Sequence, residues 1–349
     1  MTQQTAFLLT TVAVLVTFGL LINSHFGEQK YENRMSKIVK AINSMDTTWQ
    51  AHDYQEWNGM TFGDLRAMNG YKRTQRPEEI PLFTYSNVEL EQLDLPQNFS
   101  SIEKWPHCKT IGEIRDQSSC GSCWAFASST TMSDRYCIGT GINTRISSED
   151  LVSCCFICGM GCEGGNSYPS WLWFRHHGLV TGYIFNDTTT CRPYTITPCA
   201  HFPGEGRPVC PKNHSKTPKC VKKCIPQYPK TYEEDLKYAT DIYSVSGAKH
   251  MQAELYKNGP IQANFQVYED FKTYKSGVYQ HKTGGFLGGH SVRIVGYGVE
   301  NGIPYWRVAN SWGVTWGDKG FFKFLRGANE CQIEYEALVG TGTLKKDTN

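Results

Sequence analysis

The chain has 349 residues, which is more than one ordinary domain needs and leaves room for removable segments at the front. Its 35 Lys and Arg residues nearly balance its 33 Asp and Glu residues, so no strong electrostatic field favours nucleic acid or an acidic membrane as a partner. We therefore expect one catalytic unit with additional segments.

The chain begins with an apolar segment. Residues Ala6 to Ile22 are apolar apart from Thr and Gly, and a polar stretch starts at Asn23. This pattern predicts a secretory signal peptide over residues 1–24, although no basic residue precedes the apolar run. The alternative is an uncleaved membrane anchor, but 17 residues would only just span a bilayer.

Two short helices and a linker are predicted next. From Glu28 to Ala41, apolar residues recur three or four positions apart, which is typical of an amphipathic helix. A weaker helical pattern covers Gly59 to Gly70. The acidic, proline-containing stretch from Arg73 to Asp94 is expected to be an extended linker.

Cysteines are confined to the later part of the chain. All 14 lie between Cys108 and Cys331, a density typical of a disulfide-bonded domain that forms in an oxidising compartment. Three N-glycosylation sequons, at Asn98, Asn186 and Asn213, agree with passage through the secretory pathway. We therefore expect lysosomal or extracellular delivery.

Helical patterns precede strand patterns in this later part. Ser122 to Ile138 begins with small residues and continues with large apolar ones, which predicts a buried helix that starts near Cys123. In the last third, β-branched and aromatic runs bounded by glycine are typical of strands. The predicted strands are Val278–Tyr279, His290–Tyr297, Tyr305–Ala309 and Gly320–Leu325. Helical patterns earlier in the chain and strand patterns in its last third indicate an α+β fold with two lobes packed face to face.

A cysteine motif stands at the start of the predicted helix. Cys120-Gly121-Ser122-Cys123-Trp124 is the sequence that surrounds the nucleophile of papain-like proteases. A thiol at a helix N-terminus feels the positive end of the helix dipole, which favours the thiolate that attacks carbonyl carbons. The alternatives are that Cys123 belongs to a disulfide, or that Cys120 and Cys123 form a thioredoxin-like redox pair. The redox pair requires a βαβ context, which the flanking sequence does not provide.

A histidine and an asparagine complete a catalytic set. His290 begins an apolar strand, where most single histidines have a structural role. Asn310, at the end of another predicted strand, offers an amide that can orient the imidazole, and Trp312 can shield their hydrogen bond from water. The three groups Cys123, His290 and Asn310, in this order, predict nucleophilic catalysis by a thiol.

The region from Leu95 to about Gly340 resembles the papain family of cysteine proteases and, within it, the cathepsin B group. Further motifs follow the order found in that family. They are Ile114-Arg115-Asp116-Gln117, Gly164-Gly165, Cys191-Arg192-Pro193-Tyr194, Tyr256-Lys257-Asn258-Gly259-Pro260 and Tyr274-Lys275-Ser276-Gly277-Val278-Tyr279. The resemblance implies a papain-like fold, with a helical N-terminal lobe, a β-barrel-like C-terminal lobe and the active-site cleft between them.

The same resemblance divides the chain into three parts. Thr47 to Ala51 is similar to the short propeptide of the cathepsin B group, although a loose N-terminal tail is the alternative. The implied division is a signal peptide at 1–24, a propeptide at 25–94 and a peptidase domain at 95–349. We expect the propeptide to lie across the cleft until it is released.

The resemblance also implies the mechanism. Cys123 and His290 would form a thiolate and imidazolium pair, with the thiol pKa lowered to about 3–4 as in papain. The side chain of Gln117 and the backbone N–H of Cys123 would hold the oxyanion, and Asn310 would orient the imidazole. Ser118 replaces the glycine usual in the family, which we expect to shift the oxyanion donor only slightly. No cofactor and no metal ion is implied.

Six disulfides are implied by the same resemblance. They are Cys108–Cys137, Cys120–Cys162, Cys154–Cys220, Cys155–Cys158, Cys191–Cys224 and Cys199–Cys210. Cys123 remains as the nucleophile and Cys331 as a buried free thiol. A zinc site at Cys154, Cys155, Cys158 and Cys162 is the alternative, but it requires reduced thiolates, which an oxidising compartment disfavours.

Several residues are implied to bind substrate. Gly164, Gly165 and Trp312 would line the cleft, and Glu336 would lie at the base of the pocket for the second side chain before the cut, where a carboxylate accepts Arg as well as apolar groups. The alternative for Glu336 is a solvated glutamate near the C-terminus. In the wall of that pocket, Asn166-Ser167 replaces the usual Tyr-Pro, which leaves its apolar preference open.

The segment 199–210 is similar to the occluding loop with which the cathepsin B group removes C-terminal dipeptides. That group has two adjacent histidines that hold the substrate's terminal carboxylate, whereas this chain has His201 and Phe202. We therefore expect weakened dipeptidase activity and favoured endopeptidase activity. The alternative is a disulfide-closed surface loop in which His201 occurs by chance.

The anchoring of this loop is expected to be reduced. His201 can pair with Asp116 as a latch when its imidazole is protonated, below about pH 6.5. The loop arginine is Arg207, and Thr315 stands at the position of the acid that normally pairs with it. We therefore expect the loop to open readily.

The expected partners are protein and peptide substrates, the chain's own propeptide as an inhibitor, and cystatin-like inhibitors. A monomer that binds no nucleic acid and keeps no stable membrane association after signal removal is expected. The alternative function is a catalytically inactive papain-like binding protein. Such proteins usually lack the nucleophile or the base, whereas Cys123 and His290 are both present here.

Overall fold

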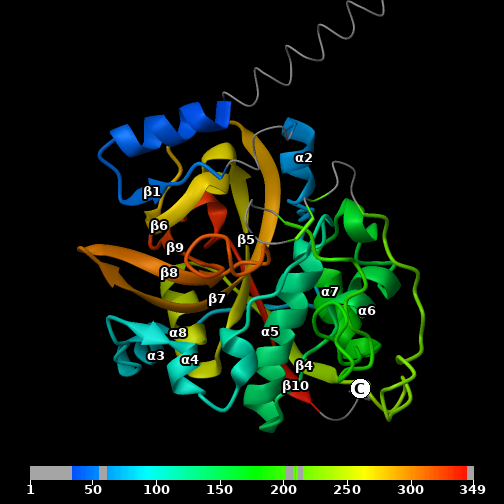
Figure 1. Cartoon of the computed structure of the whole chain (residues 1–349). Helices are drawn as coiled ribbons and strands as arrows, with labels where there is room; N and C mark the ends of the chain where they lie inside the picture. Colours follow the sequence, from blue (N-terminus) through cyan, green and yellow to red (C-terminus); the bar gives the residue numbers. More distant parts are fainter. Residues whose placement is uncertain (1–33, 55–60, 201–206, 209, 211–214, 344–349) are drawn as a thin grey trace, which may run out of the picture.

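Helices and strands segregate into two lobes in the computed structural model, which describes residues 34–54, 61–200, 207, 208, 210 and 215–343 (Figure 1). Residues 34–44 are helical. The other α-helices of the described part are α2 (Phe62–Ala67), α3 (Asn87–Gln92), α4 (Ser101–Lys104), α5 (Cys123–Thr140), α6 (Ser148–Cys154), α7 (Ser167–His176) and α8 (Ala248–Asn258). The strands are β1 (Trp49–Ala51), β2 (Leu82–Phe83), β3 (Phe99–Ser100), β4 (Tyr238–Val245), β5 (Ile261–Tyr268), β6 (Tyr274–Tyr279), β7 (Phe286–Glu300), β8 (Ile303–Ala309), β9 (Phe321–Leu325) and β10 (Ala337–Thr343).

One sheet runs through the second lobe. Its strand order is β1-β6-β9-β8-β7-β5-β10-β4-β2, and β3 pairs with β7. The long strand β7 pairs antiparallel with β5 on one side and with β8 on the other, and its register shifts between Ile294 and Gly296. The four predicted strands of the last third correspond to parts of β6, β7, β8 and β9. The α+β architecture with two lobes is confirmed.

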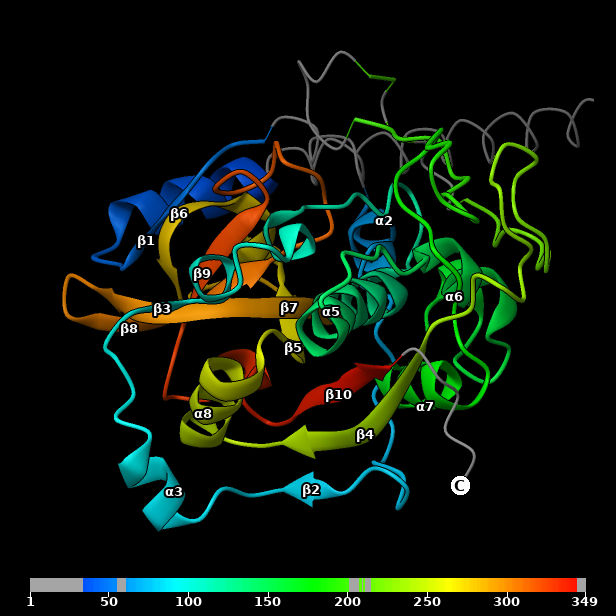
Figure 2. The ribbon, with the colours of Figure 1, turned by 90° about the horizontal axis from the view of Figure 1, so that it is seen from below.

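The helix α5 lies where the two lobes meet and packs on β7 and β10 (Figures 1 and 2). It is buried along nearly its whole length, as the run of small and apolar residues predicts. Ser122 provides no side-chain cap at its N-terminus, so the first backbone N–H groups of the helix remain free to act on the residue that begins it, Cys123. The helix ends at Gly141, whose φ of 76° is left-handed.

The segment before Leu95, which we call the prosegment, packs on both lobes. Its helix at 34–44 contributes to the apolar core of the β-rich lobe, and β1 pairs antiparallel with β6 (Figure 1). Trp49 is buried there, and its indole N–H donates to the carbonyl of Gln280 at 2.9 Å. Farther along, β2 pairs in parallel with β4 (Figure 2).

The linker prediction for Arg73 to Asp94 is wrong in part. The structure has β2 and the helix α3 in this stretch. Ser86 caps α3 by accepting from the Glu89 backbone N–H, while the Glu89 carboxylate accepts from the Ser86 backbone N–H. This capping box satisfies two helix-end donors, which is the physical reason for a helix here.

The six disulfides implied by the resemblance are all present in the structure. Cys123 and Cys331 are free. Cys331 is partly exposed rather than buried as expected, and its thiol donates to Glu330 Oε1 at 3.3 Å. The zinc alternative is wrong, because all four of its proposed ligands are bonded in disulfides.

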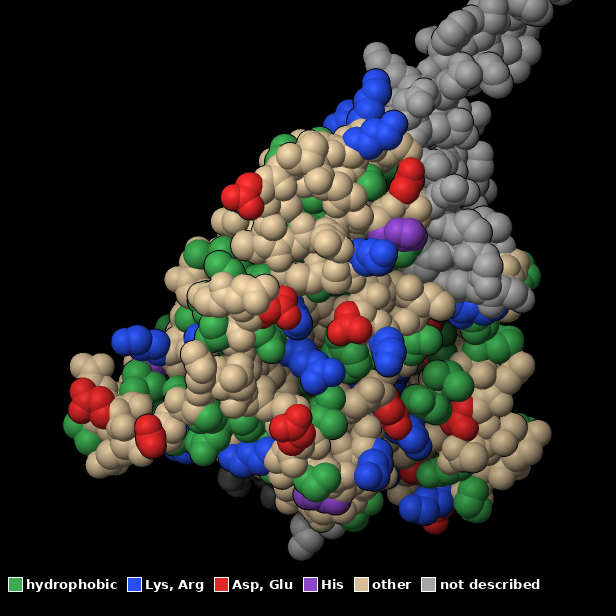
Figure 3. Space-filling model, turned by 60° about the vertical axis from the view of Figure 1, so that its left-hand side comes forward, with side chains coloured by type: hydrophobic (Ala, Val, Ile, Leu, Met, Phe, Trp, Pro, Cys, Tyr) green, Lys and Arg blue, Asp and Glu red, His purple; other side chains and the backbone are tan. Residues whose placement is uncertain are grey.

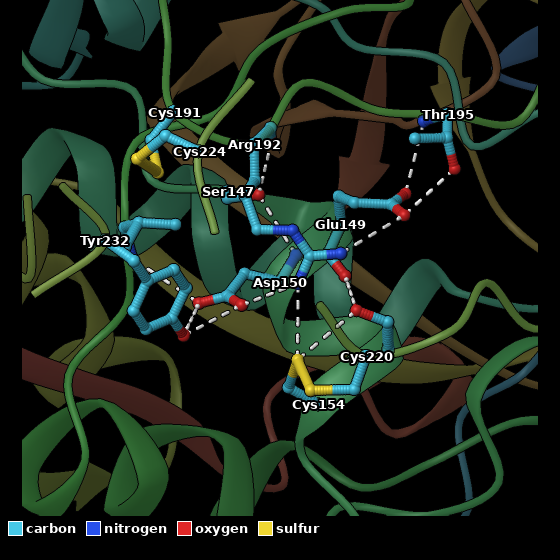
Figure 4. A network of polar contacts seen from close by, with 12 residues as sticks. Ser147, Glu149, Asp150, Cys154, Cys191, Arg192, Thr195, Cys220, Cys224 and Tyr232 are labelled. Carbon is cyan, nitrogen blue, oxygen red and sulfur yellow. Dashed lines mark hydrogen bonds and ion pairs between the residues drawn. A yellow bond between two sulfur atoms is a disulfide. The ribbon is translucent and has the colours of Figure 1, made fainter. Parts of the chain in front are cut away.

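A buried ionic network anchors the segment between Cys191 and Cys224 to the helical lobe (Figure 4). The guanidinium of Arg192 donates to Asp150 at 3.0 Å, and Tyr232 donates to the same carboxylate at 2.9 and 3.0 Å. Both partners of the ion pair are buried, and burial raises the pKa of Asp150 despite the arginine. Because an unpaired buried charge is costly, each partner requires the other in this position.

The surface of the molecule carries both signs of charge. On the face drawn in Figure 3, basic and acidic side chains are interspersed among hydrophobic ones rather than gathered into one area. Within the described ranges, we find no helix long and apolar enough to cross a membrane. The predicted signal peptide at 1–24 lies outside the described residues.

Candidate active site

The predicted nucleophile is the first residue of α5. Cys123 is fully buried, and backbone N–H groups of Trp124, Ser291, Gly70 and Tyr71 face its sulfur. Two of these N–H groups, those of Gly70 and Tyr71, belong to the prosegment. Burial raises the pKa of the Cys123 thiol to about 11, although the N–H groups act in the opposite direction.

The predicted base lies on β7 and is hydrogen-bonded to the predicted asparagine. His290 Nε2 and Asn310 Oδ1 are 2.8 Å apart, so Nε2 carries a proton and Nδ1 is available to accept one. Within the described part of the chain, Nδ1 has no hydrogen-bond partner. Trp312 packs against the imidazole, with ring centroids 4.8 Å apart, and is itself fully buried. The structure therefore brings the predicted residues His290, Asn310 and Trp312 together.

The pair of nucleophile and base is neutral in this covered state. Burial lowers the pKa of His290 to about 3, so the imidazole is uncharged at higher pH. The thiol, with its pKa at about 11, keeps its proton at lower pH. Both shifts disfavour the charged forms, so the covered state disfavours the thiolate and imidazolium pair expected of an active protease.

The predicted oxyanion donor is occupied by the prosegment. The side-chain amide of Gln117 donates to the carbonyl of Met68 at 3.0 Å and to that of Cys120 at 2.8 Å. Its oxygen accepts from the hydroxyl of Ser311 at 2.7 Å, a positioning contact that the sequence did not reveal. The Met68 carbonyl oxygen of the prosegment thus accepts a hydrogen bond from Gln117 that the predicted oxyanion would otherwise accept.

The serine that replaces the family's glycine has a positive φ. Ser118 has a φ of 54°, in the left-handed region that favours glycine, and it is buried. Its hydroxyl donates to the carbonyl of Thr197 at 2.7 Å, and its backbone N–H donates to Asp116 Oδ1 at 2.8 Å. These hydrogen bonds offset the backbone strain and tie the nucleophile loop to the base of the Cys199–Cys210 loop.

The prosegment follows the cleft with its main chain. Tyr71 N–H donates to the Gly289 carbonyl at 3.1 Å, and Lys72 N–H donates to the Gly165 carbonyl at 2.8 Å. In return, Gly165 N–H donates to the Gly70 carbonyl at 2.9 Å. Gly165, predicted to bind substrate, therefore binds an extended backbone here. Gly164 lies close to the same backbone, since a Cβ at this position would be 2.6 Å from the Gly70 carbonyl oxygen. A groove of about 540 Å³ runs beside this segment.

The predicted specificity glutamate lines the same groove. Glu336 Oε2 accepts from the hydroxyl of Tyr168 at 2.6 Å, and Oε1 forms an ion pair with Nε of Arg76, a prosegment residue, at 2.9 Å. The sequence did not reveal Tyr168 as part of this wall. It follows the Asn166-Ser167 pair directly, and Asn166 itself caps the N-terminus of α7 rather than lining the pocket as an aromatic residue would.

The loop arginine has an acidic partner, contrary to our expectation. Arg207 Nη1 donates to Asp116 Oδ2 at 3.0 Å, so the carboxylate predicted to pair with His201 binds Arg207. Thr315 therefore does not leave the arginine without an anion. His201 and Phe202 lie outside the described residues.

Two of the three sequons lie in the described part of the chain. Asn98 and Asn186 are exposed, as a glycosylation acceptor must be, whereas Asn213 lies outside the described residues. The amide oxygen of Asn98 accepts from the Val299 backbone N–H at 3.0 Å.

Comparison with known proteins gives one consistent result. The model of the papain family of cysteine proteases matches residues 95–341. Cathepsin B-like cysteine proteinase 5 of Caenorhabditis elegans is 48% identical over 261 residues, which cover 72% of this chain and 76% of that protein. Cathepsin B-like cysteine proteinase of Schistosoma japonicum is 38% identical over 347 residues, which cover 95% of this chain and 99% of that protein.

Solved structures agree with these relatives. Procathepsin B S9 from Trypanosoma congolense matches with a TM-score of 0.75 and 36% identity, over 88% of this chain and 98% of that chain. A recombinant stem bromelain precursor matches with a TM-score of 0.64 and 22% identity, over 91% of this chain and 92% of that chain. Because the bromelain precursor is only 22% identical, its similarity is evidence for the fold alone.

Proposed function

Because the chain belongs to the papain family of cysteine proteases, we propose that its mature form cleaves peptide bonds through a thioester on Cys123. The thiolate attacks the carbonyl carbon of the scissile bond, and the oxyanion is held by the Gln117 amide and the Cys123 backbone N–H. Removing one such donor typically costs about 2.7–4 kcal/mol of transition-state stabilisation. His290 protonates the leaving amine, and water then hydrolyses the thioester, which restores the thiol.

The observation that carries this proposal is the path of the prosegment backbone over the thiol. Its N–H groups face Cys123, its Met68 carbonyl accepts from Gln117, and it exchanges hydrogen bonds with Gly165. These contacts hold an extended backbone in the cleft, and they support a cleft built for peptides. The test is whether a thiol-directed epoxide labels the activated protein at Cys123 and abolishes its hydrolysis of a peptide.

We further propose that the chain is made as a secreted or lysosomal precursor. The division comprises a signal peptide at 1–24, a propeptide at 25–94 and a mature enzyme from Leu95. The start of the family match at residue 95 supports the last boundary, and the apolar run from Ala6 to Ile22 supports the signal peptide. The six disulfides and the exposed sequons at Asn98 and Asn186 support an oxidising route of synthesis. We also propose that cystatin-like inhibitors bind the mature enzyme and that the protein is a monomer.

The carboxylate of Glu336 should select a cation in the pocket for the second side chain before the cut. Its ion pair with Arg76 and its hydrogen bond from Tyr168 support this role. In the mature enzyme, Glu336→Gln is expected to lower kcat/KM for substrates with Arg at that position by about tenfold, because a charge-assisted hydrogen bond is lost. Substrates with Phe there should change less than about twofold. The measurement is kcat/KM on the matched Arg and Phe peptides.

Glu233→Gln, at an exposed surface position, is the matched control and should leave both substrates unaffected. An equal loss for Arg and Phe substrates in Glu336→Gln would contradict the assignment.

The occluding-loop sequence predicts weak dipeptidase activity. With Phe202 in place of a second histidine, one charge-assisted hydrogen bond to the substrate's terminal carboxylate is missing, which costs about 1.5–3 kcal/mol before solvent exposure reduces it. Phe202→His is therefore expected to increase the preference for a free over an amidated C-terminus at pH 5. The measurement compares matched peptides of both kinds between pH 4.5 and 7. A strong preference for free C-termini in the unaltered enzyme, unchanged by Phe202→His, would contradict the prediction.

A further inference from the structure

A buried lysine lies beside the catalytic groups. Lys272 belongs to the short 3-10 helix Glu269–Thr273 between β5 and β6, and it is fully buried. Its Nζ lies 3.7 Å from the centroid of the Trp312 ring, a cation–π arrangement that holds the amine over the indole. The same tryptophan packs on the imidazole of His290. The amine interacts electrostatically with both catalytic groups, Cys123 and His290.

In this structure the prosegment contacts Lys272. Its Nζ donates to Oδ1 of Asn69 at 3.5 Å, and Asn69 is in turn held by a hydrogen bond to the Leu287 carbonyl at 3.4 Å. Burial lowers the pKa of Lys272 well below its usual range. Loss of the prosegment removes Asn69 and admits water, so the amine regains its charge in the open cleft.

The order of contacts along the prosegment shows on which side of the nucleophile this lysine lies. Asn69 contacts Lys272, the N–H groups of Gly70 and Tyr71 face Cys123, and Arg76 pairs with Glu336. The cleft therefore runs from Lys272 past Cys123 to the Glu336 pocket. Since that pocket takes a side chain before the cut, Lys272 lies on the side that holds the residue after the cut. Its contact with Trp312, beside the imidazole that protonates the leaving amine, supports the same side independently.

We propose that Lys272 forms, with Trp312, the subsite for the side chain of the first residue after the scissile bond, and that it makes the mature enzyme favour Asp or Glu there. This inference rests on the proposed peptidase function. A carboxylate in this position would accept a charge-assisted hydrogen bond from an amine that is already oriented by the indole. A buried amine next to a catalytic pair is costly, because burial disfavours its charged form, and such costs are concentrated at functional sites.

The test is a peptide series with one fixed sequence before the cut, an amidated extension after it, and Glu, Gln, Leu or Lys as the first residue after the cut. For the activated full enzyme, kcat/KM should be about tenfold or more higher with Glu than with Gln, the range of a charge-assisted hydrogen bond. Lys272→Met removes the charge at similar volume and should abolish this ratio. Lys275→Met changes an exposed lysine three positions later and should preserve it.

The outcomes separate the inference from the proposed function. Absence of hydrolysis for all peptides would contradict the peptidase function itself. Hydrolysis with equal kcat/KM for Glu and Gln in the unaltered enzyme would overturn the inference, and this result does not depend on whether any variant folds. A parallel series ends in a free carboxylate at the first residue after the cut. A preference only for those peptides would also overturn the inference, because the lysine would then bind a terminal carboxylate instead of a side chain.

Discussion

Replacing Cys123 with serine is expected to abolish peptidase activity in the activated protein, by on the order of 10⁴-fold or more. The thiol is oriented by N–H groups at the start of α5 and lies next to the strand that carries His290. A hydroxyl has a far higher pKa than a thiol and cannot form the anion in this setting. The measurement is kcat/KM on a peptide substrate after the prosegment has been removed by another protease.

The second free cysteine provides the matched control. Cys331→Ser changes a thiol that is partly exposed and hydrogen-bonded to Glu330. This variant should retain most of the activity. Both variants should keep the six disulfides and the melting temperature of the unaltered protein. Appreciable turnover by a folded Cys123→Ser enzyme would contradict the thioester mechanism.

Replacing Gly70 with alanine should release the inhibition of the precursor. A Cβ at this position would lie 1.7 Å from the carbonyl oxygen of Gly121, a backbone atom in the nucleophile loop that cannot move aside as a side chain can. Overpacking of this kind costs about 1–3 kcal/mol or more, so occupancy of the cleft by the prosegment should fall at least about tenfold. The measurement is the rate at which iodoacetamide alkylates Cys123 in the intact precursor.

Gly63→Ala is the control for this experiment, since its Cβ would meet only the Thr61 hydroxyl oxygen at an ordinary 3.5 Å. It should leave the alkylation rate unchanged. If Gly70→Ala precursors stay as unreactive as Gly63→Ala precursors, the close contact between the prosegment and the nucleophile loop does not govern access to the thiol.

Local sequence motifs, with the family resemblance that they carry, were sufficient to predict a cysteine peptidase. Cys123 stands in a motif whose small residues permit a tight turn into a helix. His290 lies within β7, which begins earlier than the predicted strand, and Asn310 directly follows β8, and the pattern of β-branched and aromatic residues marks both strands. The disulfide pairs came from family resemblance, because spacing alone does not fix connectivity among 14 cysteines. The helix α3 could have been predicted from Ser86 and Glu89, whose spacing is that of a capping box.

Other features depend on contacts between distant residues and left no local signal. The ion pair of Arg207 with Asp116 joins positions 91 residues apart. Tyr168 reaches Glu336 across 168 residues, and only the folded lobes bring them together. Lys272 is a similar case, since a lysine between Phe271 and Thr273 gives no indication in the sequence that the chain buries it over Trp312.

Alkylation of Cys123 as a function of pH, in the precursor and in the mature enzyme, tests the central claim most directly. In the precursor, with pKa values of about 11 for the thiol and about 3 for the imidazole, the pair is neutral from pH 4 to 8 and the reaction should be slow throughout. In the mature enzyme the thiolate and imidazolium pair forms, and alkylation at pH 6 should be at least about 100-fold faster. Equal rates in the two forms at pH 6 would contradict the account that the prosegment keeps a competent thiol neutral by covering it.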